Sequence, residues 1–331
     1  MRCVTPALLA LAFTPGLASA APAVASKSPA ATSASVASAA SDQSEYQSML
    51  KMAEQAAKGN AAALKKLALD ASNGDVAAEF GFGQYYYLTK SDAQAAQWWQ
   101  KAAAQGSPSA EYFLGLFYSL GKGVAKDPAK AVELYQKAAA QDLIAAEIAL
   151  GLAYDDGVGV PQDHAQAVTW LQKAADEGDP TAQASLGDHY VDGSGVPQDY
   201  SQAVVWIRKA AEQGDPDAQN NLSSLYGGGH GVPQDSDKAL FWARKAADNG
   251  NATAASNLCG YYASLADAVD NVIAYKWCVI GRAFSMPRSE AHARSQTTID
   301  VLTPKMTQDE IAQAQDEAAD WEEKFKAKKH P

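Results

Sequence analysis

The sequence predicts an all-α protein, a solenoid of about six helix-turn-helix repeats of 36 residues with helical caps at its ends. Three observations predict it. Ala dominates the apolar residues, and Ala favours helices and lets them pack closely. A set of apolar anchors recurs at a fixed period, which is the signature of a repeat architecture. With 47% hydrophobic and 20% charged residues, the chain also has enough apolar material for a core.

The first helix of each repeat is marked by an Ala, a Leu four residues later and a Tyr eight residues later. This spacing defines one face of an amphipathic helix. A Gly follows the Leu in three copies, and the missing side chain would let a neighbouring helix come close. The Ala anchors are Ala110, Ala146, Ala182, Ala218 and Ala254, and a weaker first copy has Ala78, with Phe82 in place of the Leu.

A turn of the form Gly-x-Gly-Val follows, and then the second helix. An Asp stands where the N-cap of that helix belongs, at 163, 199 and 235. The helix closes at a Gly in most copies, as at Gly178, and Asp142 takes this place in the first clear repeat. The Asp residues lack the dense oxygen spacing of a Ca²⁺ loop, which favours their role as caps.

A Trp series runs through the second helices, at 98, 99, 170, 206 and 242. Aromatic rings in a row could form a stacking platform, or they could pack between neighbouring repeats. Their 36-residue period and their place on the second helix favour packing in the core.

The combined pattern is Ala-x-x-x-Leu-Gly-x-x-Tyr, Gly-x-Gly-Val-x-x-Asp, Ala-x-x-Trp-x-x-Lys-Ala-Ala. It resembles the Sel-like repeat family, relatives of the tetratricopeptide repeats, over roughly residues 74–285. The resemblance implies a right-handed superhelix of helix pairs whose first helices line the inner surface. It also implies a role as a scaffold or adaptor, because family members mostly hold other proteins.

The ends of the chain differ from the repeats. Residues 1–20 resemble a signal peptide, with Arg2, a short apolar stretch and an Ala-Ser-Ala cleavage pattern. The alternative is an Ala-rich tail on a cytosolic protein. We expect a periplasmic or secreted protein with no stable membrane insertion after signal removal, since no second long apolar run occurs. The remaining expected segments are a disordered linker (21–43), N-terminal capping helices (44–73), the repeat solenoid (74–289) and C-terminal capping helices with a charged tail (290–331).

The face opposite the Ala, Leu and Tyr anchors is the candidate binding groove. Residues two and six places after each Ala point there by the 100° helical step. Uncovered apolar residues in such a row would suit a peptide or helix partner. The alternative is that the N-terminal helices or inter-repeat packing cover the first of them. The candidate partner-binding residues are Phe80, Gln84, Tyr112, Leu116, Ile148, Leu152, Asp188 and Asn220.

Cys259 and Cys278 are the two cysteines that follow the signal peptide. An even number in an oxidising compartment favours a disulfide, and both residues fall on facing helices of one predicted hairpin. The alternative is a pair of buried thiols, because the Cα separation cannot be read from sequence.

The sequence predicts a binding protein without enzymatic activity, metal or cofactor. The five His residues form no metal-ligand spacing, and no nucleophile or phosphate-loop motif occurs. A net charge of −11 without a basic stripe argues against nucleic acid. We therefore expect an exported scaffold that binds a protein or peptide partner of unknown identity. The alternative is a secreted cell-wall-active protein that binds or processes peptidoglycan or β-lactam-like ligands.

Overall fold

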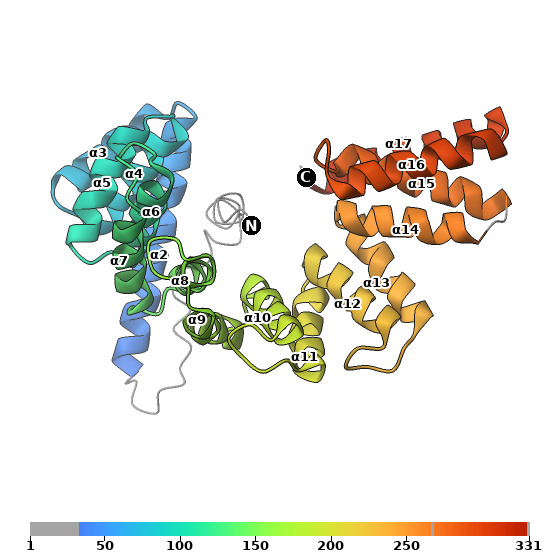
Figure 1. The fold of residues 1–331 in the computed structure, drawn as a ribbon. Coiled ribbons are helices and arrows are strands. Elements are labelled where there is room, and N and C mark those ends of the chain that lie inside the picture. Colours follow the sequence, from blue (N-terminus) through green and yellow to red (C-terminus); the bar gives the residue numbers. More distant parts are fainter. Residues whose placement is uncertain (1–32, 266–267, 330–331) are drawn as a thin grey trace. The chain divides into compact units, whose positions relative to one another are not determined.

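The computed structural model describes residues 33–265 and 268–329, which contain helices and no strands (Figure 1). The predicted signal peptide, residues 1–20, and the first part of the predicted linker lie outside these residues. The chain divides into two compact units, residues 1–182 and 183–331. Each unit is a stack of helical hairpins.

The first unit holds a long N-terminal helix and the hairpins of the early repeats. Its helices are α2 (Ser33–Ala57), α3 (Ala61–Ser72), α4 (Val76–Leu88), α5 (Asp92–Ala104), α6 (Pro108–Leu120), α7 (Pro128–Ala139), α8 (Ile144–Asp156) and α9 (His164–Asp176). Each helix packs on the next one along the chain from α3 to α9. Helix α10 (Pro180–Asp192) follows and crosses the boundary between the two units.

The second unit continues the hairpins and ends in an atypical cap. Its further helices are α11 (Tyr200–Glu212), α12 (Pro216–Gly228), α13 (Ser236–Asp248), α14 (Ala252–Ser264), α15 (Ala268–Phe284), α16 (Glu290–Leu302) and α17 (Gln308–Lys329), with a short 3₁₀ turn at Thr303–Lys305. Helices α16 and α17 both pack on α15. The all-α repeat fold that the sequence predicts is therefore confirmed.

The helix ends follow the chemistry that the repeat motif indicates. Asp163 caps α9, because its side chain accepts hydrogen bonds from the backbone N–H groups of Ala165 and Gln166 at 3.0 Å. Asp199 and Asp235 cap α11 and α13 in the same way. Gly178 follows α9 with a φ of +97°, and the matching Asp142 has a φ of +58°. An Asp tolerates this left-handed conformation, so the departure from Gly leaves the turn intact.

The Gly after the repeated Leu has no side chain, so the second helix of the same hairpin can pack closely against it. A Cβ atom on Gly151 would lie 2.7 Å from Cγ of Leu171, and one on Gly187 would lie 2.3 Å from Cγ1 of Ile207. At such distances a side chain at either position would force the facing Leu171 or Ile207 to shift. The expected close helix approach is confirmed.

The Trp residues pack in or against the core, and lysines lie over several of their rings. Trp99 is fully buried and Trp206 is 8% exposed, whereas Trp98, Trp170 and Trp242 are half-buried. The Lys three residues after a Trp lies over its ring, with Nζ 3.8 Å from the Trp206 ring centroid in one hairpin. This cation–π contact explains why Lys recurs three residues after Trp in the motif.

The N-terminal region differs from the expected linker. The sequence predicts disorder over residues 21–43, but α2 begins at Ser33. The segment is rich in Ala, the strongest helix former, and it precedes a helix already anchored on α3 and α4. Elongation of an existing helix costs less than nucleation, so the helix extends into the Ala-rich stretch.

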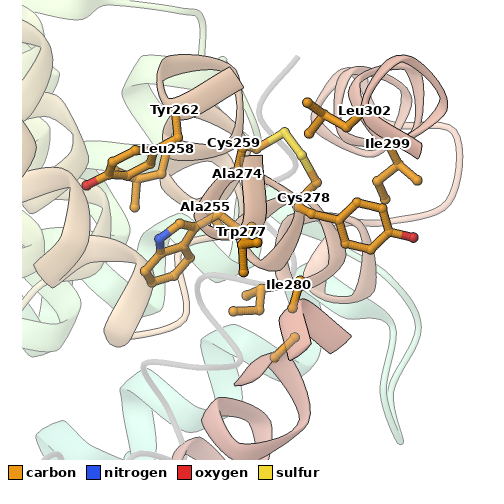
Figure 2. Packing of buried hydrophobic residues seen from close by; sticks show 14 of the residues in the cluster. Ala255, Leu258, Cys259, Tyr262, Ala274, Trp277, Cys278, Ile280, Ile299 and Leu302 are labelled. Carbon is orange, nitrogen blue, oxygen red and sulfur yellow. A yellow bond between two sulfur atoms is a disulfide. The ribbon is translucent and has the colours of Figure 1, made fainter. Parts of the chain in front are cut away.

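The last hairpin, α14 and α15, carries the disulfide. Cys259 on α14 and Cys278 on α15 are joined, with Cα atoms 4.8 Å apart (Figure 2). Around them lie Leu258, Trp277 and, from α16, Ile299 in one buried cluster. Both cysteines are at most 1% exposed, so the bridge lies inside the core of the second unit.

Candidate partner-binding face

The first helices of the repeats carry the residues expected to face a partner. These residues stand two and six places after the repeated Ala, on α4, α6, α8, α10 and α12. The structure divides them into two groups. Those in the first unit are largely buried, whereas those in the second unit are partly exposed and polar.

Four of the predicted groove residues are buried. Phe80, Tyr112, Leu116 and Ile148 are each at most 3% exposed. The prediction that they form an uncovered apolar row is therefore wrong, and the alternative, in which the N-terminal helices and inter-repeat packing cover them, describes the structure. Gln84 and Leu152, the two other candidates in the first unit, are partly exposed.

Phe80 is covered by the N-terminal helix. The Tyr46 ring on α2 lies 5.7 Å from the Phe80 ring, and its hydroxyl donates to Oγ of Ser107 at 3.0 Å. On the other side, Phe113 lies 5.7 Å from Phe80. The ring is thus enclosed by α2 and α6, and it belongs to the core of the first unit.

Tyr112 and Leu116 are covered by α7, the second helix of their own hairpin, and by α8 of the next hairpin. Both lie in the cluster formed with Ala131 and Tyr135 of α7 and Ala149 of α8. Burial, with a smaller effect from the Asp179 carboxylate, raises the pKa of the Tyr112 phenol well above its usual value. A partner therefore cannot reach these side chains without displacing a neighbouring helix.

The second unit presents an open polar row on its first helices. Asp188 on α10 and Asn220 on α12 were predicted here, and both are partly exposed. Asn221 and Asn257 join them, because Nδ2 of Asn221 donates to Oδ1 of Asp188 at 2.8 Å and Nδ2 of Asn257 donates to Oδ1 of Asn220 at 3.4 Å. These four residues, from α10, α12 and α14, are called the polar row below.

The polar row retains hydrogen-bonding capacity. An Asn side chain has two N–H donors and an oxygen with two lone pairs. Asn221 and Asn257 each use one N–H in the bonds of the row, and Asn220 uses its oxygen. The remaining donors and acceptors match the N–H and C=O groups of a peptide backbone, so the row can hold an extended or helical segment by its polar groups.

A second polar series runs inside the hairpins, one residue after the Ala anchor in the first five repeats. Its members are Glu79, Glu111, Glu147, Gln183 and Gln219, each at most 5% exposed. In four hairpins an amide at the end of the second helix donates to this residue, as Gln141 Nε2 does to Glu111 at 3.0 Å and Gln213 Nε2 does to Gln183 at 2.9 Å. The series fixes one helix of a hairpin on the other and does not face solvent.

Glu147 is the exception, because Glu177 stands where the other hairpins carry an amide. A carboxylate cannot donate, so Lys173, one turn earlier, donates from Nζ to Oε1 of Glu147 at 2.9 Å. Burial raises the pKa of the Glu147 carboxyl, and the bond to Glu147 raises the pKa of Lys173. In this hairpin an ion pair between Lys173 and Glu147 takes the place of the hydrogen bond that a side-chain amide donates in the other hairpins.

Sequence reasoning missed Asn221 and Asn257, as well as the buried Glu and Gln series. The signal for the series was present, since Glu or Gln follows the Ala anchor in five successive repeats. No such signal exists for Asn221 and Asn257, because their side chains meet the row only through the packing of successive hairpins.

Among residues 33–265 and 268–329, no three His, Cys, Asp or Glu side chains lie together in a way that could hold a metal ion. The same residues include no helix whose length and apolar character would let it cross a membrane.

The repeats match a known family along more than half of the chain. The model of the Sel1 repeat matches five times, at residues 74–107, 108–143, 144–179, 180–215 and 216–251, which together exceed half of the chain. The chain belongs to the Sel1 repeat family. Sel1 repeat proteins are generally scaffolds without enzymatic activity, and this helical repeat fold is typical of protein–protein interaction.

Two solved Sel1-type structures resemble the chain. A Sel1 repeat protein from Oxalobacter formigenes is 31% identical with a TM-score of 0.64, and the match covers 74% of this chain and 98% of that one. A protective antigen of uropathogenic Escherichia coli strains with an SLR fold is 20% identical with a TM-score of 0.55, covering 89% and 95%. The second likeness concerns the fold alone. No curated protein matches the chain.

Proposed function

We propose that this Sel1 repeat protein is an exported scaffold that binds a protein or peptide partner on the polar row. The observation that carries the proposal is the row itself. Asp188, Asn220, Asn221 and Asn257 come from three successive first helices. They form two hydrogen-bonded pairs, Asp188 with Asn221 and Asn220 with Asn257, and each residue stays at least partly exposed. These bonds lie at the surface, whereas the buried Gln183 and Gln219 bond within the core.

Affinity capture from native envelope extract tests the binding. The variant Asp188→Lys, Asn220→Lys reverses the charge at 188 and removes the side-chain amide at 220, and both substituted residues are partly exposed. The control is Gln202→Lys on the exposed side of α11. We expect a specific protein retained by the wild type and the control and lost by the variant. Equal retention by all three proteins would show that the partner binds elsewhere.

Export is supported by the signal-like residues 1–20 and by the buried disulfide, which fits an oxidising compartment. Expression in the native host followed by fractionation and N-terminal sequencing tests it. A periplasmic or secreted protein that begins at Ala21 is the expected result. A full-length chain that keeps Met1 and stays in the cytoplasm, with free thiols at Cys259 and Cys278, would refute export.

A further inference from the structure

The first helices of the repeats carry no basic residue. Although the chain has 27 Lys and Arg residues, none of them lies within α4, α6, α8, α10, α12 or α14. The basic residues of the repeats lie in the turns and on the second helices, such as Lys209 on α11 and Lys245 on α13. The charged side chains of the first helices are therefore acidic.

Three carboxylates of the second unit lie on the face that carries the polar row. Asp188 and Asp192 stand six and ten places after the Ala anchor of α10, and Asp217 stands one place before the Ala anchor of α12. By the 100° helical step, these positions point to the same side as Asn220. Asp188 is partly exposed, and Asp192 and Asp217 are exposed. A partner on this side therefore meets negative charge on both helices.

Hydrogen bonds within the second unit orient two of these carboxylates. Asp188 accepts from Nδ2 of Asn221 at 2.8 Å, and Asp217 accepts from Nδ2 of Asn251 at 2.7 Å. Both donors are neutral amides, so these bonds leave the negative charges in place. An ionised carboxylate can accept several hydrogen bonds. The amides thus hold the carboxylates in position without cancelling their charge.

The basic residues on the second helices of this unit make their contacts away from the row. Arg208 on α11 donates to the Tyr226 hydroxyl at 2.8 Å, and Nζ of Lys209 lies 3.8 Å from the Trp206 ring centroid. Those of α13 and α15 contact acidic, amide and aromatic side chains that are not part of the row. None of these contacts places a cation on the row.

The N-cap of α12 is subject to the same negative field. The Asp215 side chain accepts a hydrogen bond from the backbone N–H of Ala218 at 2.7 Å. Burial raises the pKa of the Asp215 carboxyl, and the Asp217 and Asp188 carboxylates raise it further, whereas backbone hydrogen bonds lower it. Carboxylates from α10 and α12 therefore act on one another across the two helices.

We propose that the polar row binds a basic segment of its partner, whose Lys or Arg side chains pair with Asp188 and Asp217. The inference rests on the proposed binding at the row and names the chemistry of the partner. An Arg guanidinium matches a carboxylate through two parallel hydrogen bonds, and a Lys ammonium pairs with it as a point charge. Because the carboxylates are exposed or partly exposed, binding weakens as salt rises.

Panning of a random peptide library against the full-length protein tests the proposal. A parallel selection on Asp188→Lys, Asn220→Lys identifies the peptides that bind elsewhere on the protein. We expect the peptides that are enriched on the wild type alone to be rich in Lys or Arg. Fluorescence anisotropy then measures the Kd of synthetic copies at low and at high salt.

The variant Asp188→Asn, Asp217→Asn neutralises both carboxylates and keeps an oxygen that can accept from Asn221 and Asn251. We expect it to weaken peptide binding at low salt by about threefold to tenfold, the loss of two exposed ion pairs. Its remaining affinity should depend less on salt than that of the wild type.

The matched control is Asp237→Asn, Glu212→Gln, which removes two exposed carboxylates from α13 and α11. Asp237 lies in the first turn of α13 as Asp217 does in that of α12, so both variants lose one charge near a helix N-terminus. The two variants have the same net charge. The control should bind the peptides within about twofold of the wild type.

Three results would overturn the proposal. Acidic or uncharged peptides that bind the wild type and not Asp188→Lys, Asn220→Lys would exclude a basic partner while supporting binding on the row. An equal loss of affinity in Asp188→Asn, Asp217→Asn and in the control would assign the effect to the overall charge of the protein. If no peptide distinguishes the wild type from Asp188→Lys, Asn220→Lys, the row binds no peptide, and the proposed function fails as well.

Discussion

At the scale of single residues, the buried Glu and Gln series shows how one repeat position serves different chemistries. Glu111 and Gln183 occupy equivalent places, are both buried, and accept a bond from an equivalent Gln. The carboxylate at 111 carries a charge that the amide at 183 lacks. Burial raises the pKa of the Glu111 carboxyl, and the Lys137 charge and the Gln141 bond offset only part of the effect.

The raised pKa of Glu111 gives a pH-dependent stability. A carboxyl with a higher pKa in the folded state binds more protons there, so its contribution is most favourable below the unfolded pKa and is lost as pH rises through the folded pKa. We expect Glu111→Gln to match the wild type near pH 4 and to have the higher free energy of unfolding at pH 7. Thermal or urea unfolding at both pH values measures it. Parallel pH profiles for the two proteins would contradict the assigned role, and Gln183→Glu should show the opposite change.

Residue-scale prediction from the sequence was uneven for a physical reason. Caps such as Asp163 depend on neighbours in the chain, so the motif alone located them. The exposure of Phe80 depends on Tyr46, which lies in a different helix outside the repeat pattern. The helical step gave the direction of the Phe80 side chain but not what packs on it.

At the scale of the element, close packing of the two helices in a hairpin depends on one Gly. The first helix has Gly151 against Leu171 in one hairpin, whereas in α14 a Cβ added to Gly260 would have no atom within 4 Å. Both residues lie inside helices, where Gly costs stability relative to Ala. Substitution at Gly151 therefore reports on helix packing, and substitution at Gly260 reports on helix propensity alone.

Substitution of these glycines by Ala should have opposite effects. Gly151→Ala forces a methyl group against Leu171 and should destabilise the protein by about 1–3 kcal/mol. Gly260→Ala adds no clash and should stabilise it by about 0.5–1 kcal/mol, because it lowers the entropy of the unfolded chain. Urea unfolding followed by circular dichroism compares the two variants. A neutral Gly151→Ala or a destabilising Gly260→Ala would show that Gly packing does not control the hairpin.

The boundaries of the elements were predictable where the motif contains a cap, a turn or a closing Gly. The repeat helices α6 to α13 therefore begin and end close to the expected places. Helix α2 begins earlier than expected because no residue between Ser33 and the predicted capping helix stops it. The composition of that segment fits a linker as well as a helix, and only its attachment to α3 and α4 decides between them.

At the scale of the whole molecule, the disulfide stabilises only the part of the chain in which it lies. Cys259 and Cys278 are 19 residues apart and close a loop within the α14–α15 hairpin. Repeat proteins are stabilised mainly by contacts between neighbouring repeats, so a local crosslink acts locally. Both cysteines lie in the second unit.

Loss of the bridge should therefore loosen the second unit selectively. For a loop of this size the expected loss is about 3 kcal/mol. Hydrogen exchange on the full chain should show faster exchange in α14 and α15 after reduction, and unchanged exchange in α4 and α5. The Cys259→Ala, Cys278→Ala variant should exchange like the reduced protein and should not respond to reductant. A uniform increase along the chain would refute a local role.

Site-specific photocrosslinking in living cells shows whether a partner binds on the polar row. A photoreactive amino acid is placed at Asn220 in the row or at Gln202 on α11, and whole cells of the native host are irradiated. Binding on the row predicts a discrete crosslinked protein from position 220 and none from 202. No crosslink from 220, or the same products from both positions, would contradict binding on the polar row.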